Sequence, residues 1–285
     1  MRDRDGELAA ADAYCVMLAQ RHYENFSVAS KLLPAQTRLH LARIYAYCRT
    51  TDDLGDESGS KERGRQRLAQ WRAEVEQMFA GGPAVHPVLI ALSRTVADFE
   101  MGKSPFLDLI AANVQDQEVG SYETWADLIA YCRNSAAPVG RMVLSVFGIS
   151  NATTQPLSDD VCIGLQLANF AQDVARDGVL GRTYLVQADI RERGTPGATD
   201  IMVQRARELL ASGRALERMA PTVLRMQLSL YRMGGLAICD AIERIGYRTD
   251  LQRPTVTKAV KLGLLLRAVV ESLQQAREER RTEPA

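Results

Sequence analysis

The chain has 285 residues, enough for one large domain with a buried core. Its 35 basic residues balance 35 acidic ones, so the overall charge does not indicate a nucleic-acid-binding protein. The five cysteines form no CxxC pair, and the polar start lacks the apolar stretch of a signal peptide. We therefore expect a cytoplasmic protein with free thiols and no membrane-spanning helix.

Apolar residues recur at helical spacing along almost the whole sequence, and strand-type alternation is missing. The spacing predicts helices over residues 6–23, 36–55, 61–80, 85–101, 104–114, 122–134, 136–148, 156–177, 199–218, 220–247 and 255–281. Breaks are expected at prolines such as Pro34 and Pro138, and over the stretch from Gly178 to Gly197. No linker or repeat divides the sequence, so we expect a single all-α domain over residues 1–285.

Acidic residues crowd the end of the second predicted helix, in the segment IYAYCRTTDDLGDES. One face of that helix is predicted to carry Tyr45, Arg49, Asp52 and Asp56, which follow spacings of four, three and four. Like charges four apart repel by roughly 0.2–0.5 kcal/mol per pair. A bound cation would compensate for this repulsion, although a single acidic run is more often a solvated helix end.

A second polar stripe lies on the helix predicted over residues 156–177. It consists of Gln166, Asn169, Asp173 and Asp177, set among large apolar residues. Buried polar groups without partners cost roughly 1–3 kcal/mol each, so a stripe without a function would be unfavourable. Carboxylate and amide oxygens suit Mg²⁺, which also takes phosphate oxygens of a substrate. Two such helices facing each other would bind Mg²⁺ and a diphosphate.

Other catalytic signatures are missing from the sequence. The three histidines, His22, His40 and His86, lack the spacing of zinc ligands. The sequence contains no GxSxG, P-loop or GxGxxG motif. Acyl transfer, nucleotide hydrolysis and Rossmann-type dinucleotide binding therefore lack their usual signatures.

The segments YAYCRTTDDLGDE and LQLANFAQDVARDGVLGRTYL resemble the two aspartate-rich signatures of the squalene/phytoene synthases. HYENFSVASKLLP and YCRNSAAPVGRMVLSVFG add shorter matches, and the resemblance runs over about residues 14–275. It implies a single-domain, all-α isoprenoid synthase fold and a prenyltransferase that ionises an allylic diphosphate. Mg²⁺ would neutralise the leaving diphosphate, and a dry channel would protect the carbocation from water.

The resemblance also implies roles for individual residues. The metal and diphosphate anchors would be Asp52, Asp56, Asn169, Asp173 and Asp177. The residues around the diphosphate would be His22, Asn25, Ser27, Arg49, Gln166, Arg182 and Tyr184. The hydrocarbon channel would be lined by Phe26, Tyr45, Tyr131, Val139 and Gly140, and the rings of Tyr45 and Tyr131 would stabilise the cation. Phe26 and Tyr131 are equally consistent with core residues, and His22 with a helix cap.

The second motif departs from the condensing members of the family, which often read NILRDVxED where this chain reads NFAQDVARD. Gln172 stands where an arginine is common, and Arg176 replaces an acid. Arg176 is either a solvated charge near Asp173 or a sign that the site binds one diphosphate instead of two. With ENFSVAS, the motif resembles the hydroxysqualene synthase branch of the bacterial hopanoid pathway. That branch ionises presqualene diphosphate and lets water end the reaction.

Two other functions stay open on the sequence alone. One is the condensation of two farnesyl diphosphates to presqualene diphosphate, squalene or dehydrosqualene. The other is a catalytically dead helical interaction protein, against which the intact acid pairs argue. NADPH is not expected, although relatives that use it also lack a Rossmann motif.

The expected partners follow from this chemistry. The substrate would be presqualene diphosphate or farnesyl diphosphate, and nucleic acid is not expected. The amphipathic helix over residues 255–281 would make a peripheral contact with the inner face of the membrane, although core packing is the commoner use of such a helix. Other enzymes of the hopanoid pathway are further expected partners.

Overall fold

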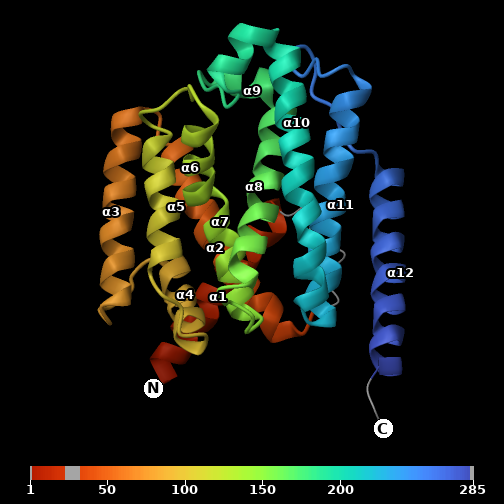
Figure 1. Ribbon diagram of the computed structural model, residues 1–285. Coiled ribbons are helices and arrows are strands. Elements are labelled where there is room, and N and C mark those ends of the chain that lie inside the picture. The colour runs from red at the N-terminus through yellow and green to blue at the C-terminus, as the bar shows by residue number, and fades with distance from the viewer. Residues whose placement is uncertain (1, 23–32, 283–285) are drawn as a thin grey trace. The chain divides into compact units, whose positions relative to one another are not determined.

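The computed structural model describes the backbone of residues 2–22 and 33–282, and the side chains of residues 5–21 and 33–271. In these ranges the chain is helical, and its extended pairing is limited to one parallel bridge between Ser121 and Thr183 (Figure 1). The all-α prediction is confirmed. None of the helices described here is both long and apolar enough to cross a bilayer.

The helices fall into two compact units. The first unit, residues Met1–Val119 and Arg133–Ser150, contains α1 (Arg2–His22), α2 (Ala35–Asp56), α3 (Lys61–Phe79), α4 (Pro87–Asp98), α5 (Ser104–Gln115) and α7 (Ala137–Val146). The second unit, residues Gly120–Cys132 and Asn151–Ala285, contains α8 (Thr154–Gln172), α9 (Val174–Val179), α10 (Gln187–Met219), α11 (Thr222–Arg244) and α12 (Lys258–Thr282). Helix α6 (Trp125–Ser135) contributes residues to both units. The single domain stays a prediction.

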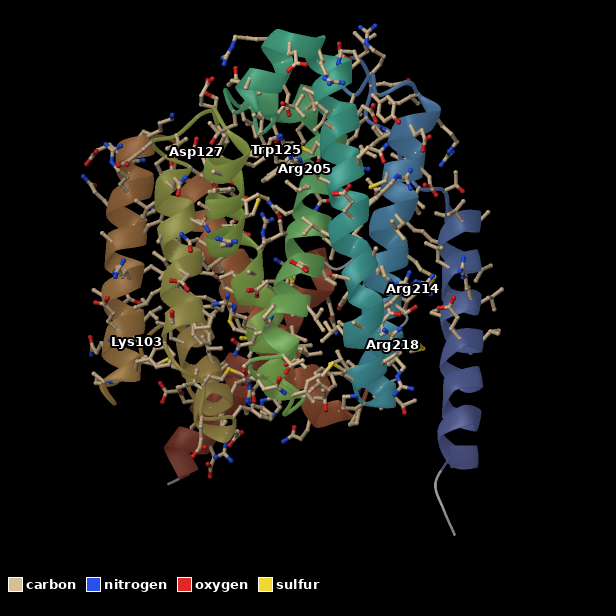
Figure 2. The ribbon with its side chains drawn as sticks, in the orientation of Figure 1. Lys103, Trp125, Asp127, Arg205, Arg214 and Arg218 are labelled. Carbon is tan, nitrogen blue, oxygen red and sulfur yellow. The ribbon has the colours of Figure 1, made fainter. Side chains whose placement is uncertain are left out.

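The second unit starts α10 inside the stretch that the sequence predicts as a break. Gly194 bends this helix, with φ of 68° and ψ of 175°, because glycine adopts positive φ without a steric penalty. Before the bend, Asp189 accepts a hydrogen bond from the indole Nε1 of Trp125 at 2.8 Å. After it, the guanidinium of Arg205 lies 4.2 Å from the centre of the same indole ring (Figure 2). Trp125 therefore contacts α10 on both sides of the bend.

Helix α2 is the central helix of the first unit, where it packs against α1, α3, α4, α5 and α7. Tyr47 is buried, and its hydroxyl donates to the backbone oxygen of Phe106 on α5 at 2.8 Å. The ring of Tyr47 stacks on Trp71 of α3, with centroids 5.9 Å apart. Trp71 donates in turn to Thr51 of α2 at 3.0 Å. These contacts fix the rotation of α2, and with it the direction of its acidic end.

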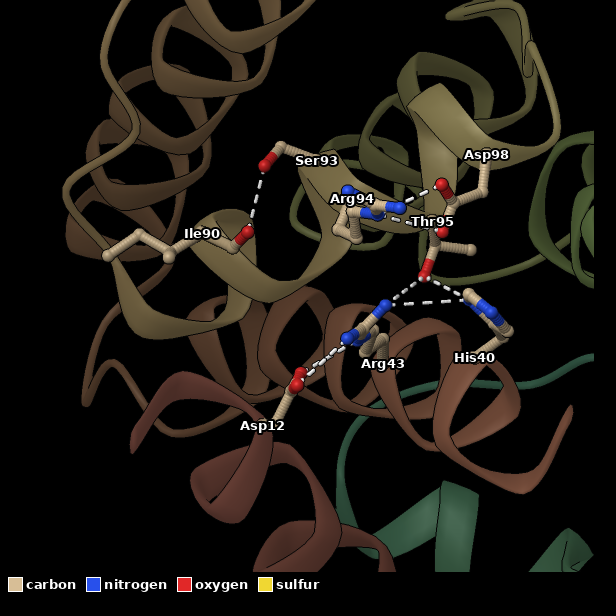
Figure 3. A network of polar contacts seen from close by, with 8 residues as sticks. All are labelled: Asp12, His40, Arg43, Ile90, Ser93, Arg94, Thr95 and Asp98. Carbon is tan, nitrogen blue, oxygen red and sulfur yellow. Dashed lines mark hydrogen bonds and ion pairs between the residues drawn. The ribbon is translucent and has the colours of Figure 1, made fainter. Parts of the chain in front are cut away.

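A buried polar network joins α1, α2 and α4 (Figure 3). Arg43 forms a bidentate ion pair with Asp12, with distances of 2.7 and 2.8 Å. Thr95 lies 3.3 Å from Arg43 and 3.0 Å from the Nδ1 atom of His40. Burial, aided by the charge of Arg43, lowers the pKa of His40. Because bidentate pairs are geometrically specific, the network sets how the three helices cross.

Candidate functional site

The last two turns of α2 carry the first acidic motif of the chain. Arg49 pairs there with two acids outside the predicted stripe, because its Nη2 atom lies 2.5 Å from Asp53 and 3.5 Å from Glu57. The Nε atom of Arg49 is buried and has no hydrogen-bond partner among the residues that the structure describes. A buried donor without a partner is unfavourable by roughly 1–3 kcal/mol. A phosphate oxygen would satisfy it, which fits the role predicted for this arginine.

Asp52 is the half-buried carboxylate of this motif. Its Oδ1 atom accepts a hydrogen bond of 3.1 Å from Nδ2 of Asn113, a buried residue of α5. Burial raises the pKa of Asp52 to about 6, against the hydrogen bond from Asn113, and the charge of Asp56 adds to the rise. A cation would relieve both the desolvation and the repulsion. Asp52 is therefore placed where a positive charge is favourable.

Gly55 lets two amide side chains, one on α5 and one just after it, approach the acidic end of α2. A Cβ atom at this position would lie 3.1 Å from Nε2 of Gln117 and 3.4 Å from Oδ1 of Asn113. Glycine inside a helix is about 0.5–1 kcal/mol less favourable than alanine, so the close approach explains its presence. Asn113 and Gln117 are not among the site residues predicted from the sequence, although two buried amides four apart in an apolar segment form a stripe like the predicted ones.

The remaining predicted residues of the first unit lie on α2 and α7, which pack against each other. Tyr45 is half-buried, and burial raises its pKa, so the phenol is neutral near pH 7. Asp56 is exposed, whereas Val139 and Gly140 are half-buried. The channel that Tyr45, Val139 and Gly140 would line stays a prediction.

The second acidic motif lies at a break between two helices. The prediction of one continuous helix over residues 156–177 is wrong, because Asp173 has the non-helical angles φ −103° and ψ 17° between α8 and α9. Just after the break, the amide of Ala175 donates to the carbonyl of Thr249 at 3.3 Å. The amide of Asp177 donates to the carbonyl of Asp173 at 2.8 Å. The two aspartates thus stay one turn apart although Asp173 lies at the break and Asp177 lies on α9.

Asp173 is paired with a cationic side chain that the sequence analysis did not identify. Arg253 donates to both carboxylate oxygens of Asp173, with 3.3 Å between Nη2 and Oδ2. Nη2 of Arg253 also donates to Oε1 of Gln172 at 3.2 Å. Gln172 is buried, and its Nε2 atom donates to the carbonyl of Pro254 at 2.7 Å. A lone arginine about 80 residues away in sequence carries no motif that could have revealed this contact.

Tyr131 and Tyr184 belong to one buried aromatic cluster of the second unit. Its members are Tyr122, Tyr131, Phe170 and Tyr184. Phe170 and Tyr184 stack with centroids 3.8 Å apart, and Tyr131 lies 5.8 Å from Tyr184. The sequence analysis gave no site role to Tyr122 or Phe170. The cluster places Tyr131 and Tyr184 together beside α8, and a contact with substrate stays a prediction.

The other predicted residues of the second unit lie on α8 and after α9. Gln166 is half-buried and Asn169 is exposed on α8. Arg182 is half-buried, and its backbone amide donates to the carbonyl of Asp177 at 2.9 Å. His22 ends α1 without a described side chain, and Asn25, Phe26 and Ser27 lie outside the described residues.

The oxygen-rich side chains fit Mg²⁺ better than a metal that needs an all-protein site. Among the side chains that the structure describes, no three carboxylate, histidine or thiol groups come together to hold a metal. Mg²⁺ needs only one or two carboxylates, because water and substrate phosphates complete its coordination. In the first unit, the raised pKa of Asp52 and the Nε of Arg49 suit a cation and a phosphate oxygen. In the second unit, taken by itself, Asp173 already pairs with a cationic side chain.

Comparison with known proteins identifies the family. The squalene/phytoene synthase family profile matches residues 19–260. The chloroplastic phytoene synthase 3 of Zea mays is 32% identical over 295 aligned positions, which cover 94% of this chain and 68% of the relative. The phytoene synthase of Arthrospira platensis is 30% identical over 63% of each chain. The chain thus spans about two thirds of the length of these relatives.

Solved structures agree with this assignment. The crystal structure of squalene synthase HpnC from Alicyclobacillus acidocaldarius is 42% identical, with a TM-score of 0.79 over 85% of this chain and 96% of that one. A dehydrosqualene synthase in complex with a ligand has a TM-score of 0.85 at 22% identity, over 96% and 99% of the two chains, which supports the fold alone. The chain therefore belongs to the squalene/phytoene synthase family, whose members act on isoprenyl diphosphates, and has the all-α isoprenoid synthase fold.

Proposed function

We propose that this chain is a Mg²⁺-dependent hydroxysqualene synthase, which converts presqualene diphosphate and water to hydroxysqualene and diphosphate. The observation that carries the branch is the 42% identity to the squalene synthase HpnC, against 32% to the phytoene synthase 3 of Zea mays. The second motif, with Gln172 and Arg176, supports the same branch. The C–O bond of the substrate breaks with both electrons leaving on the diphosphate. Water then adds its oxygen to the rearranged cation and loses a proton.

In the proposed reaction, some residues of the chain would stabilise the developing charges and others would exclude bulk water. Asp52, Asp56, Asn169, Asp173 and Asp177 would hold the metal. When bound, Mg²⁺ supplies Lewis-acid neutralisation of the leaving diphosphate. The buried Nε of Arg49 would donate to a phosphate oxygen. The ring faces of Tyr45 and of the aromatic cluster would stabilise a nearby cation and exclude bulk water.

Product analysis with two substrates offered separately tests the branch. With Mg²⁺ and no NADPH, presqualene diphosphate should yield hydroxysqualene, and oxygen-18 from labelled water should appear in the alcohol. Conversion of farnesyl diphosphate alone to presqualene diphosphate, dehydrosqualene or squalene would establish condensation instead. Failure to release diphosphate from either substrate would favour the non-enzymatic alternative.

Two variants test the assigned acids in the same assay. Asp52→Asn and Asp177→Asn should lose turnover while the circular dichroism spectrum stays that of the wild type, because each removes a metal ligand. Asp240→Asn is the matched control, since this acid pairs on the surface with Arg207. Wild-type turnover with unchanged Mg²⁺ dependence in both site variants would contradict the metal site.

We also propose that α12 makes a weak contact with the inner face of the membrane, where the hydrocarbon substrate and product partition. It exposes Val260, Leu262, Leu266 and Val270. Lys258 and Lys261 at its start suit an anionic surface. Flotation with phosphatidylglycerol vesicles should show salt-sensitive binding that the double variant Leu262→Ser and Leu266→Ser loses. Equal flotation of the double variant would rule out α12 as the contact. Contact with other hopanoid-pathway enzymes stays a prediction.

A further inference from the structure

Arg253 lies on the segment between α11 and α12, and its guanidinium contacts Asp173 of the second acidic motif. It donates from Nε and Nη2 to the two carboxylate oxygens of Asp173. An arginine guanidinium is charged at any pH at which the protein is folded. The carboxylate is mostly buried, with 19% of the side chain exposed, whereas the arginine side chain is 48% exposed. The guanidinium thus covers Asp173 from the solvent side.

We propose that Arg253 occupies, in the metal-free protein, the place on Asp173 that Mg²⁺ takes, and that Gln172 holds it there. The proposal rests on the proposed function, because it requires Asp173 to bind the metal. A bidentate guanidinium takes one lone pair of each carboxylate oxygen and holds a positive charge against them, so a metal cation that binds the same carboxylate competes with it. Arg253 is then a positioning residue that tunes the affinity of the site for Mg²⁺.

Gln172 can hold Arg253 because an amide both donates and accepts. Its Nε2 atom donates to the carbonyl of Pro254, and its Oε1 atom accepts from Nη2 of Arg253. An arginine at position 172 could donate to Pro254, but it has no acceptor for Arg253 and would repel it. The glutamine, which departs from the pattern of the condensing members, is therefore the residue type that brings the 253–254 segment to Asp173.

The backbone joins the same two segments next to this contact. The amide of Ala175, two residues after Asp173, donates to the carbonyl of Thr249, four residues before Arg253. If Mg²⁺ displaces Arg253, this backbone bond and the hydrogen bond from Gln172 to Pro254 still hold the segment near the site. Amide hydrogen exchange over residues 250–253 should therefore rise several-fold when Mg²⁺ is added to the wild type, because a side-chain restraint is lost.

Calorimetric titration of Mg²⁺, alone and with inorganic pyrophosphate, tests the proposal without turnover. Arg253→Gln should bind Mg²⁺ alone about two- to five-fold more tightly than the wild type, the range expected for a partly exposed ion pair. Gln172→Met, which removes both hydrogen bonds but keeps an unbranched side chain of similar length, should move the affinity in the same direction by less. Arg253→Lys should restore most of the wild-type affinity.

Arg248→Gln is the matched control for the loss of charge. Arg248 lies on the same segment, is 48% exposed like Arg253, and pairs with Asp250 instead of Asp173. It should leave the Mg²⁺ affinity within two-fold of the wild type.

The outcomes separate this inference from the proposed function. If the wild type binds Mg²⁺ and neither Arg253→Gln nor Gln172→Met binds it more tightly than Arg248→Gln does, Arg253 does not compete with the metal. If the wild type binds no Mg²⁺ even with pyrophosphate, the metal site of the proposed function is wrong and the competition fails with it. Arg253→Lys and Gln172→Met decide the question should Arg253→Gln fail to fold.

Discussion

Replacement of Asp52 by asparagine should stabilise the metal-free protein above pH 6. Asparagine keeps the shape of the side chain and can still accept the hydrogen bond from Asn113, but it carries no charge. The pKa of Asp52 rises from an ordinary value of 3.8 to about 6. One pKa unit corresponds to about 1.4 kcal/mol, so the ionised carboxylate destabilises the folded state by at most about 3 kcal/mol. Because Asp52 is only half-buried, we expect asparagine to gain about 1–2 kcal/mol.

The dependence on pH follows from which state binds the proton. A carboxyl whose pKa is higher in the folded than in the unfolded state binds more protons when folded, at any pH between the two values. The metal-free wild type therefore loses stability as the pH rises from 3.8 to about 6, and the asparagine variant is spared this loss. The advantage of the variant should be small near pH 4 and complete above pH 7.

Urea unfolding in EDTA at several pH values between 5 and 8 measures this difference. Asp56→Asn should give a smaller gain, because the charge of Asp56 contributes less than burial to the raised pKa of Asp52. Equal stability of the wild type and Asp52→Asn at pH 8 would refute the reasoning. So would a difference that does not shrink between pH 8 and pH 5.

Two further predictions concern the packing that positions α2, and urea unfolding checks both. Gly55→Ala should destabilise the protein by about 1 kcal/mol, because the new Cβ atom would press on Gln117, whereas Gly234→Ala, with no atom within 4 Å of its Cβ position, should stabilise it by about 0.5–1 kcal/mol; a gain at Gly55 would mean that the amide moves aside freely. Asp12→Ala should cost about 3 kcal/mol because it leaves the charge of Arg43 buried, whereas Glu62→Ala, which breaks an exposed pair with Arg65, should leave the free energy of unfolding nearly unchanged. Similar losses in the two variants would mean that burial of Arg43 is unimportant.

The helices were predictable because a buried helix face leaves a periodic pattern that depends on neighbouring residues alone. The predicted α2 is one residue short at each end, and the predicted α3 is one residue too long at its C-terminal end. The break at Asp173 was not predictable, because the contacts around it come from Thr249 and Arg253, distant in sequence. The spacing of four correctly predicts that Asp173 and Asp177 lie one helical turn apart, but it wrongly predicts one continuous helix through both.

The interaction partners of the predicted site residues were harder to predict from the sequence than the helices. Spacing placed Asp52 on a polar stripe, but its hydrogen bond comes from Asn113, 61 residues away on α5. Spacing places Arg49 on the stripe of Asp52, but it does not predict the pairs of Arg49 with Asp53 and Glu57, because an arginine side chain reaches acids on either side of its own helix face. The partner that a side chain contacts depends on which residues the fold brings near it. The spacing of nearby residues in the sequence does not predict that partner.

The two tryptophans of the chain lie one in each compact unit, which makes each unit visible by its own fluorescence. Trp71 is buried against Tyr47, whereas Trp125 is half-buried under the guanidinium of Arg205. With Trp125→Phe, the emission comes from the first unit alone; with Trp71→Phe, it comes from the second. Coincident denaturation midpoints in the two variants would show the units melting cooperatively, and separate midpoints would reveal an intermediate in which one unit is still folded.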